Sequence, residues 1–218
     1  MRTINTLFLT GSHFCPDEQE LATLASLYPQ VNVTSVGMLA YTSRHIEQAQ
    51  IVVGLPKPED LKLAANLRWL QTPSSGVSQY VDPALYASVP PLLTNARGTY
   101  GKQIADHIIG MIIAFNHNLL CYHDQMKTRN WKRHFPVKDL WESTLVIVGL
   151  GDIGTQLALR AKAHGLRVLA VKRTATEKPP YVDELGTESE LDAFLAQADY
   201  VALCAASTQQ TEHLLDAR

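Results

Sequence analysis

The residues whose spacing most clearly indicates a chemical function in this sequence are three glycines. Gly149, Gly151 and Gly154 follow the aliphatic run Leu145–Val148 and precede a stretch of helical periodicity that continues to about His164. Between a strand and a helix, the first glycine permits a tight turn, the second lets the backbone approach a diphosphate, and the third lets the helix pack on the strand. The helix N-terminus adds unpaired amides and a partial positive charge. The spacing therefore predicts a dinucleotide-binding turn; the alternative is a glycine-rich turn that holds no ligand.

The residues around these glycines define the expected cofactor contacts. Asp152 and Ile153 supply amides at the start of the helix, where the diphosphate would lie. About twenty residues beyond the turn, where a carboxylate would bind the ribose of NAD, the sequence has Lys172-Arg173-Thr174. Two cations and a hydroxyl can bind a ribose 2′-phosphate, which a carboxylate would repel. We therefore expect NADP, with NAD as the alternative if Lys172 and Arg173 are only solvated surface charges.

Strand and helix patterns alternate along the first part of the chain. The predicted strands are Thr6–Thr10, Val31–Val36, Gln50–Leu55, Leu67–Thr72 and Pro91–Thr94. The predicted helices are Asp17–Tyr28, Ser43–Ala49, Pro58–Asn66 and Asp82–Ala87. This alternation is typical of βαβ units and of a parallel sheet that is covered on both faces. We expect residues 1–97 to form a flavodoxin-like α/β domain that binds the substrate.

A second α/β domain is expected over residues 98–218. It begins with a hinge at Arg97–Gly101 and a long helical pattern at Lys102–Asn130, which serves either as a spine of its own domain or as a dimer interface. The later predicted elements are the strands Leu145–Val148, Leu166–Val171 and Asp199–Ala205, a helix that ends at Gly165, and a helix over Glu188–Gln197. A dinucleotide fold uses two βαβαβ halves, and there is room here for about one. We therefore expect an incomplete Rossmann domain with a doubly wound parallel sheet.

Composition narrows the class of protein. Hydrophobic residues make up 46% of the chain and charged residues 18%, which is ordinary for a folded protein. A net charge of −2 and strand-sized apolar runs argue against nucleic-acid and membrane partners. The three cysteines and eight histidines have no disulfide or metal-binding spacing, so we expect no bound metal and a cytoplasmic location.

Several further motifs indicate one protein family when they are taken together with the glycine turn. They are Leu70–Val77, Leu93–Asn95, Gly98, Ile104–His107, Asp139–Leu140, Thr144–Gly154, Ala198–Val201 and Thr208–Thr211. From about residue 50 to the last residue, the chain resembles the D-isomer-specific 2-hydroxyacid dehydrogenase family, in particular its glyoxylate or hydroxypyruvate reductases and its phosphoglycerate dehydrogenases.

The resemblance implies a reaction and a set of contacts. It implies a cleft between a substrate domain and a coenzyme domain, NAD(P)H-dependent hydride transfer to a small 2-keto acid, and a homodimer formed through the coenzyme domain. The backbone at Ser75, Gly76 and Val77 would receive the substrate carboxylate, and a simple turn after a strand is the alternative. The cofactor would also contact the strand and loop that contain Cys204, Ala205 and Thr211. Ala205-Ala206 stands where the family usually has Leu-Pro.

The family's catalytic Arg, Glu and His have no counterpart in this sequence. In the family all three come after the strand that we place at Asp199–Ala205, and the sequence ends at Arg218. We therefore expect a C-terminally truncated chain with little or no turnover. The main alternative is a non-catalytic relative that binds dinucleotide or dimerises. A methyltransferase is a weaker alternative, because Lys172 stands where adenosyl ribose usually meets an acid.

Overall fold

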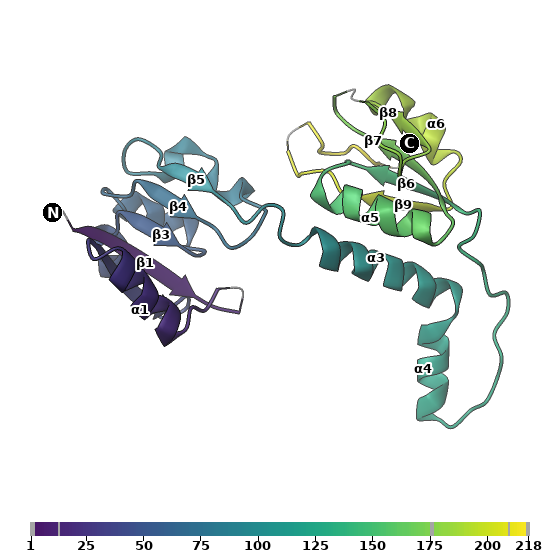
Figure 1. Cartoon of the computed structure of the whole chain (residues 1–218), viewed down its shortest axis with the longest axis horizontal. Coiled ribbons are helices and arrows are strands. Elements are labelled where there is room, and N and C mark those ends of the chain that lie inside the picture. The colour runs from purple at the N-terminus through teal and green to yellow at the C-terminus, as the bar shows by residue number, and fades with distance from the viewer. Residues whose placement is uncertain (1–2, 13, 175–176, 209, 217–218) are drawn as a thin grey trace. The chain divides into compact units, whose positions relative to one another are not determined.

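The chain divides into two compact units, Met1–Arg97 and Gly98–Arg218. The computed structural model describes residues 3–12, 14–174, 177–208 and 210–216 (Figure 1). Each unit contains its own parallel sheet and its own buried core. The two units are therefore described one at a time.

The first unit is a five-stranded parallel sheet. Its strands are β1 (Ile4–Thr10), β2 (Val31–Gly37), β3 (Ile51–Val53), β4 (Trp69–Gln71) and β5 (Leu92–Thr94). They pair in the order β2-β1-β3-β4-β5. This is the flavodoxin-like order, in which the chain winds both ways from the first strand. The predicted fold class of this unit is thereby confirmed.

The connections of the first unit differ from the prediction at two places. The helical elements are α1 (Glu18–Leu27), α2 (Ser43–Gln48) and the 3₁₀ segments η1 (Pro58–Leu63), η2 (Ser78–Tyr80) and η3 (Pro83–Leu85). α1 begins as predicted, with a capping box between Asp17 and Glu20. The α-helices predicted over Pro58–Asn66 and Asp82–Ala87 are wrong, because these short connections fold as 3₁₀ turns instead. Each of those turns begins with a proline, and the chain is extended again at Tyr86.

The second unit contains a four-stranded parallel sheet. Its strands are β6 (Thr144–Val148), β7 (Arg167–Val171), β8 (Glu184–Gly186) and β9 (Tyr200–Leu203). They pair in the order β8-β7-β6-β9. Read from β6, this is the third-second-first-fourth arrangement of a Rossmann sheet. Sequence reasoning missed β8, because a three-residue strand is too short to show alternation.

Helices cover both faces of this second sheet (Figure 1). They are α3 (Gly101–Asn116), α4 (Leu119–Lys127), α5 (Asp152–Ala163) and α6 (Leu191–Leu195), the last preceded by the 3₁₀ turn η4 (Glu188–Glu190). On one face, Leu145 and Ile147 pack in a core with residues of α3 and α5. On the other face, Val146 and Val148 pack against Phe194 and its neighbours on α6. β6 is buried along its whole length, so the glycine turn starts from a fixed point.

The single long helix predicted over Lys102–Asn130 is wrong. α3 ends at Asn116, α4 begins at Leu119, and the two helices are bent by 68° at the break between them. Asn118 lies between them with φ of 56°, a left-handed conformation that asparagine tolerates better than most residues. α3 buries Ala105 and Ile109, whereas α4 has no buried residue. The apolar pattern runs through both helices, so it could not reveal where the backbone turns.

The break also limits how far a single apolar helix extends. Within the described ranges, no single helix is both long and apolar enough to cross a bilayer. α3 and α4 reach the required length only when they are counted together, across the bend. Buried core residues on α3 account for part of that apolar character.

Candidate functional site

The carboxyl edge of the second sheet brings the predicted cofactor residues together. Val148, the last residue of β6, is in register with Val171 of β7 and with Leu203 of β9. The segments that follow these three strands therefore leave the sheet side by side. Ligands of open parallel α/β sheets bind at this edge, where the chain winds in opposite directions from neighbouring strands.

The three glycines have three different surroundings. A Cβ on Gly149, where φ is +101°, would lie 2.6 Å from the Ala205 nitrogen. A Cβ on Gly154 would overlap the carbonyl oxygen of Gly149 and lie 3.1 Å from Cγ2 of Ile147. A Cβ on Gly151 would meet nothing within 4 Å. Gly149 and Gly154 are thus required by packing, whereas Gly151 leaves an open approach to the backbone.

The amides at the start of α5 are available to a ligand. The first backbone bond of the helix runs from the Thr155 amide to the Gly151 carbonyl, at 2.9 Å. In the described part of the chain, the amides of Asp152, Ile153 and Gly154 donate to no acceptor. Unpaired amides at a helix N-terminus, next to an open backbone, suit a diphosphate. The residues present therefore fit the phosphates of a dinucleotide.

The side chain of Asp152 points to a different part of the unit. A Cβ on Gly101, the first residue of α3, would lie 2.6 Å from Oδ1 of Asp152. The carboxylate therefore packs on the start of α3, and the unpaired group that this residue offers to a diphosphate is its amide. An ion pair between Arg160 and Asp106 holds the same two helices together further along.

Lys172, Arg173 and Thr174 leave the sheet directly after β7. The Lys172 amide donates to the Gly186 carbonyl at 3.0 Å, which fixes the backbone at this point. Arg173 and Thr174 are exposed, and Lys172 is half-buried. The side chains of all three have no hydrogen-bond or ion-pair partner among the residues that the structure describes. The two cations are therefore available to an anionic group.

The segment after β9 contacts the glycine turn. The Cys204 amide donates to the Val148 carbonyl at 2.8 Å, and Ala205 lies directly against Gly149. Burial raises the pKa of the Cys204 thiol, which suits packing rather than nucleophilic chemistry. Thr211, another predicted contact, uses its hydroxyl within its own turn. That hydroxyl accepts from the Thr208 amide at 2.9 Å and donates to the Ala206 carbonyl at 2.7 Å.

In the first unit, Ser75, Gly76 and Val77 lie in the loop after β4, where Ser75 and Gly76 are exposed and Val77 is half-buried. Their amides donate to no acceptor within the described ranges, and a Cβ on Gly76 would meet nothing within 4 Å. The carbonyl of Ser75, by contrast, accepts from Nδ2 of Asn95 at 2.7 Å. Successive unpaired amides are a common receptor for an anion, so the loop suits a carboxylate.

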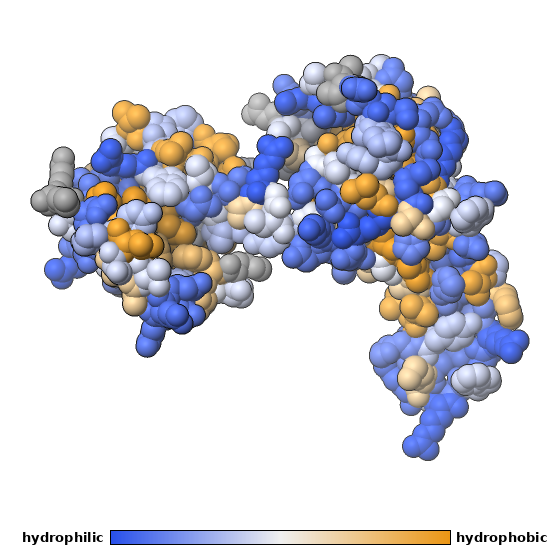
Figure 2. Space-filling model, in the orientation of Figure 1, coloured by the Kyte–Doolittle hydropathy of each residue, from blue (hydrophilic) through white to orange (hydrophobic). Residues whose placement is uncertain are grey.

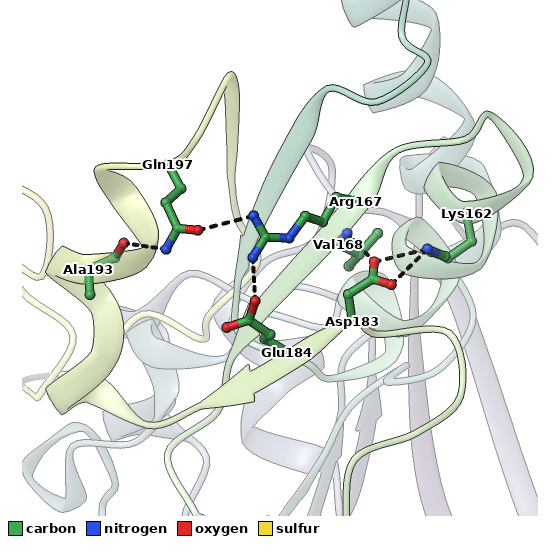
Figure 3. Close-up of polar contacts among 7 residues, drawn as sticks. All are labelled: Lys162, Arg167, Val168, Asp183, Glu184, Ala193 and Gln197. Atoms are coloured by element: carbon green, nitrogen blue, oxygen red, sulfur yellow. Dashed lines mark hydrogen bonds and ion pairs between the residues drawn. The ribbon is translucent and has the colours of Figure 1, made fainter.

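The opposite edge of the second sheet holds a polar network that sequence reasoning missed (Figure 3). Asp183 accepts from the Val168 amide at 2.7 Å and from Nζ of Lys162 at 2.9 Å. Burial raises the pKa of the Asp183 carboxyl, but these two donors outweigh it and hold the pKa below its ordinary value. Arg167 pairs with Glu184 in the same network. These residues fix the starts of strands and lie away from the glycine turn.

Asp199 performs the same task at the start of β6. It accepts from Nζ of Lys138 at 2.6 Å and from the Thr144 amide at 2.8 Å, and both lower the pKa of its carboxyl. Lys138 also lies 5.2 Å from the centre of the Tyr200 ring. A pattern search could not find these contacts, since 55 residues separate Asp199 from the amide it receives.

Two histidines lie on helices of the second unit, and a third packs against a tyrosine. Among the described residues, no group of three or more His, Cys, Asp or Glu side chains could hold a metal ion. His134 packs edge-on against Tyr122, with ring centres 5.6 Å apart, and its backbone bonds to the same tyrosine. His107 lies on α3 and His123 on α4. His13 lies outside the described residues.

The sheet order, the glycine turn and the available amides together define a dinucleotide-binding α/β protein. Residues 109–218 match the family model described as D-isomer specific 2-hydroxyacid dehydrogenase, NAD binding domain. The chain belongs to this family, as its motifs predicted. A solved structure of a D-isomer specific 2-hydroxyacid dehydrogenase family protein from Aeromonas salmonicida subsp. salmonicida A449 has a TM-score of 0.82 at 28% identity. That match covers 97% of this chain and 67% of the other.

Curated relatives include two reductases. A glyoxylate reductase of Thermococcus onnurineus is 32% identical over 138 residues, which are 59% of this chain and 39% of that protein. A hydroxypyruvate reductase of Thermotoga maritima is 25% identical over 196 residues, 82% of this chain and 61% of that protein. The chain thus spans roughly half the length of the relatives it matches.

Proposed function

We propose that this chain carries the coenzyme loop and the substrate loop of an NADP(H)-dependent reductase of small 2-keto acids. The observation that carries the proposal is the start of α5, where three amides have no acceptor among the described residues and lie beside the open backbone of Gly151. The curated relatives from Thermococcus onnurineus and Thermotoga maritima are both reductases, which supports this reaction class.

The coenzyme-binding residues have separate tasks in this proposal. The amides of Asp152, Ile153 and Gly154 bind the diphosphate, and Gly151 lets it approach. Lys172 and Arg173 bind a ribose 2′-phosphate with help from the Thr174 hydroxyl. Ala205 and its neighbours pack against Gly149 and so support the glycine turn. The bound nicotinamide supplies the hydride chemistry, while the protein orients it and excludes water.

The substrate loop receives the carboxylate of the keto acid in this proposal. The amides of Ser75, Gly76 and Val77 offer three donors without a formal charge. Hydrogen bonds to an ionised acceptor are stronger than neutral ones, so the loop would favour an anionic substrate. Selection among different keto acids depends on the protein groups that contact the end of the substrate away from its carboxylate.

Turnover requires catalytic side chains, and no residue of this sequence matches those of the family. The family's Arg, Glu and His have no counterpart here, so we expect this chain to bind coenzyme with little or no reduction of substrate. A second candidate is a non-catalytic relative that binds dinucleotide or dimerises. Steady-state assay of the chain with glyoxylate and NADPH tests whether the chain reduces substrate. Turnover of about 1 s⁻¹ or more, typical of enzymes, would exclude the non-catalytic candidate.

We also propose that the chain forms a homodimer through α3 and α4. Figure 2 shows apolar side chains gathered over the end of α3 and the start of α4. Exposed members include Phe115 at 80%, Leu120 at 72% and Met111 at 60% of their surface. Exposed apolar clusters of this kind mark interaction sites in folded proteins.

Fluorescence titration tests the coenzyme proposal directly. NADPH and NADH should both bind, with NADPH tighter by about tenfold, because only NADPH carries the extra phosphate for Lys172 and Arg173. Equal affinities, or tighter NADH, would refute the NADP assignment while leaving the diphosphate site intact. Binding of neither nucleotide would refute the proposed function of the glycine turn.

A further inference from the structure

The loop after β4 is held from behind through its carbonyl groups. The Thr72 carbonyl accepts from Nε2 of Gln71 at 2.8 Å. The Ser74 carbonyl accepts from the Thr72 hydroxyl at 3.0 Å and from the Ala96 amide at 3.1 Å. The Gly76 carbonyl accepts from the Ser74 hydroxyl at 2.9 Å. This set of bonds orients the peptide planes of the loop, because each plane is fixed once its carbonyl is fixed.

The amides that follow in the same loop are left without partners. Those of Ser75, Gly76 and Val77 donate to no acceptor in the described part of the chain. Peptide planes whose carbonyls are bound on one side direct their amides to the other side. The loop is therefore organised in advance as a receptor for an anion, and it needs little rearrangement on binding.

Asn95 has a special place in this arrangement. Its Nδ2 donates to the Ser75 carbonyl at 2.7 Å across 20 positions of sequence. That carbonyl belongs to the same peptide plane as the Gly76 amide, at the centre of the three unpaired amides. The central peptide of the loop is therefore oriented by the side chain of the residue that directly follows β5.

The backbone that precedes Asn95 is fixed by several hydrogen bonds. The residue before it, Thr94, ends β5 and accepts from the Thr72 amide at 2.9 Å through its carbonyl. The Thr94 hydroxyl accepts from Nε1 of Trp69 at 2.7 Å and donates to Oε1 of Gln71 at 2.5 Å. Gln71 in turn holds the Thr72 carbonyl. Asn95 thus extends from a bonded strand end toward the loop.

We propose that Asn95 is a positioning residue for the anion-receiving amides of the loop. By fixing the Ser75 carbonyl, it directs the Gly76 amide toward the substrate carboxylate. This inference rests on the proposed function of the loop. It predicts that Asn95 controls the affinity for a carboxylate and leaves the affinity for the coenzyme unchanged.

Amide NMR of the full chain, titrated with oxalate, tests this role. In the wild type, oxalate should shift the Ser75, Gly76 and Val77 signals. Asn95→Ala and the near-isosteric Asn95→Asp should both weaken oxalate binding, by about five- to tenfold for the alanine, because one orienting hydrogen bond is lost. NADPH affinity should stay within about twofold of the wild type in both variants.

Asn66 offers a matched control. Its Nδ2 also donates to a backbone carbonyl, that of Glu47 at 3.3 Å, but away from the loop. Asn66→Ala should leave the oxalate affinity unchanged. Equal oxalate affinity in wild type, Asn95→Ala and Asn95→Asp would overturn the positioning role while the loop keeps its function. Wild-type amides that do not respond to oxalate, in a chain that still binds NADPH, would overturn both the loop's function and this inference.

Discussion

The carboxylate of Asp152 fills the space in which a side chain on Gly101 would begin. The two residues start two helices, α5 and α3, that pack against each other on one face of the second sheet. The glycine turn is thereby tied to the first residue of α3. An acidic residue at the glycine turn is accommodated because its charge lies against the N-terminus of another helix, α3, where a negative charge is favourable.

Changing Gly101 to alanine should destabilise the second unit by about 1–3 kcal/mol, because the new methyl group overlaps the Asp152 carboxyl. Asp152→Ala should remove the overlap, so the double variant should be more stable than the sum of the two single changes predicts. Urea unfolding of all four proteins measures this coupling. Strict additivity would show that the contact is unimportant.

Gly154→Ala should mainly lower stability, whereas Gly151→Ala should mainly weaken coenzyme binding. The first places a methyl group against the Gly149 carbonyl and should cost about 2 kcal/mol or more in unfolding free energy. The second enters open space and should change stability by about 1 kcal/mol or less, while weakening NADPH binding by roughly tenfold. Thermal unfolding and NADPH titration of both variants decide this. A Gly151→Ala protein with wild-type NADPH affinity would contradict the prediction.

Lys172→Asp should weaken NADPH binding by about tenfold or more and NADH binding by much less, since it replaces a cation at the proposed 2′-phosphate site with an anion. Lys132→Asp is the matched control, because Lys132 is an exposed lysine in the loop after α4. The ratio of the two nucleotide affinities is the quantity to compare. A similar loss of affinity for both nucleotides would mean that Lys172 attracts either nucleotide through its positive charge and does not recognise the 2′-phosphate.

The stability of the second unit should fall in acid in a way that depends on Asp183 and Asp199. The pKa of each carboxyl is lower in the folded chain than its ordinary value. Each therefore stabilises the fold above its unfolded pKa, near about 4, and this contribution is lost as pH falls through the lower folded pKa. Unfolding midpoints of wild type and the double Asp→Asn variant should differ at about pH 7 and converge toward about pH 2–3. A gap that stays constant with pH would contradict the assignment.

Phe115→Glu should convert a dimer into a monomer if α3 and α4 form the proposed interface, because a buried unpaired charge is costly. Leu39→Glu is a suitable control, since Leu39 is 95% exposed in the first unit. Light scattering after size-exclusion chromatography gives the mass of each variant. A dimer that persists in Phe115→Glu, or a wild-type monomer, would reject this interface.

Local patterns were enough for the parts of the fold that depend on neighbouring residues. The glycine spacing, the strand Leu145–Val148 and the cap at Gly165 all follow from short-range backbone chemistry, and the structure contains each of them. The break at Asn118 did not follow, because an apolar stripe continues smoothly across a turn in the backbone. β8 was too short to recognise before its pairing with β7 was known.

Residue order and spacing were therefore sufficient for the fold class, the family and the place of the glycine turn, since these features are local or repeat along the chain. The tertiary structure decided which polar groups are paired within the protein and which can still bind a ligand. It placed the Asp152 carboxylate on Gly101, the Asn95 amide on Ser75 and the Asp199 carboxylate on Thr144. These contacts join residues 20 to 55 positions apart, and sequence distance does not predict which side chains the folded chain brings within hydrogen-bonding distance.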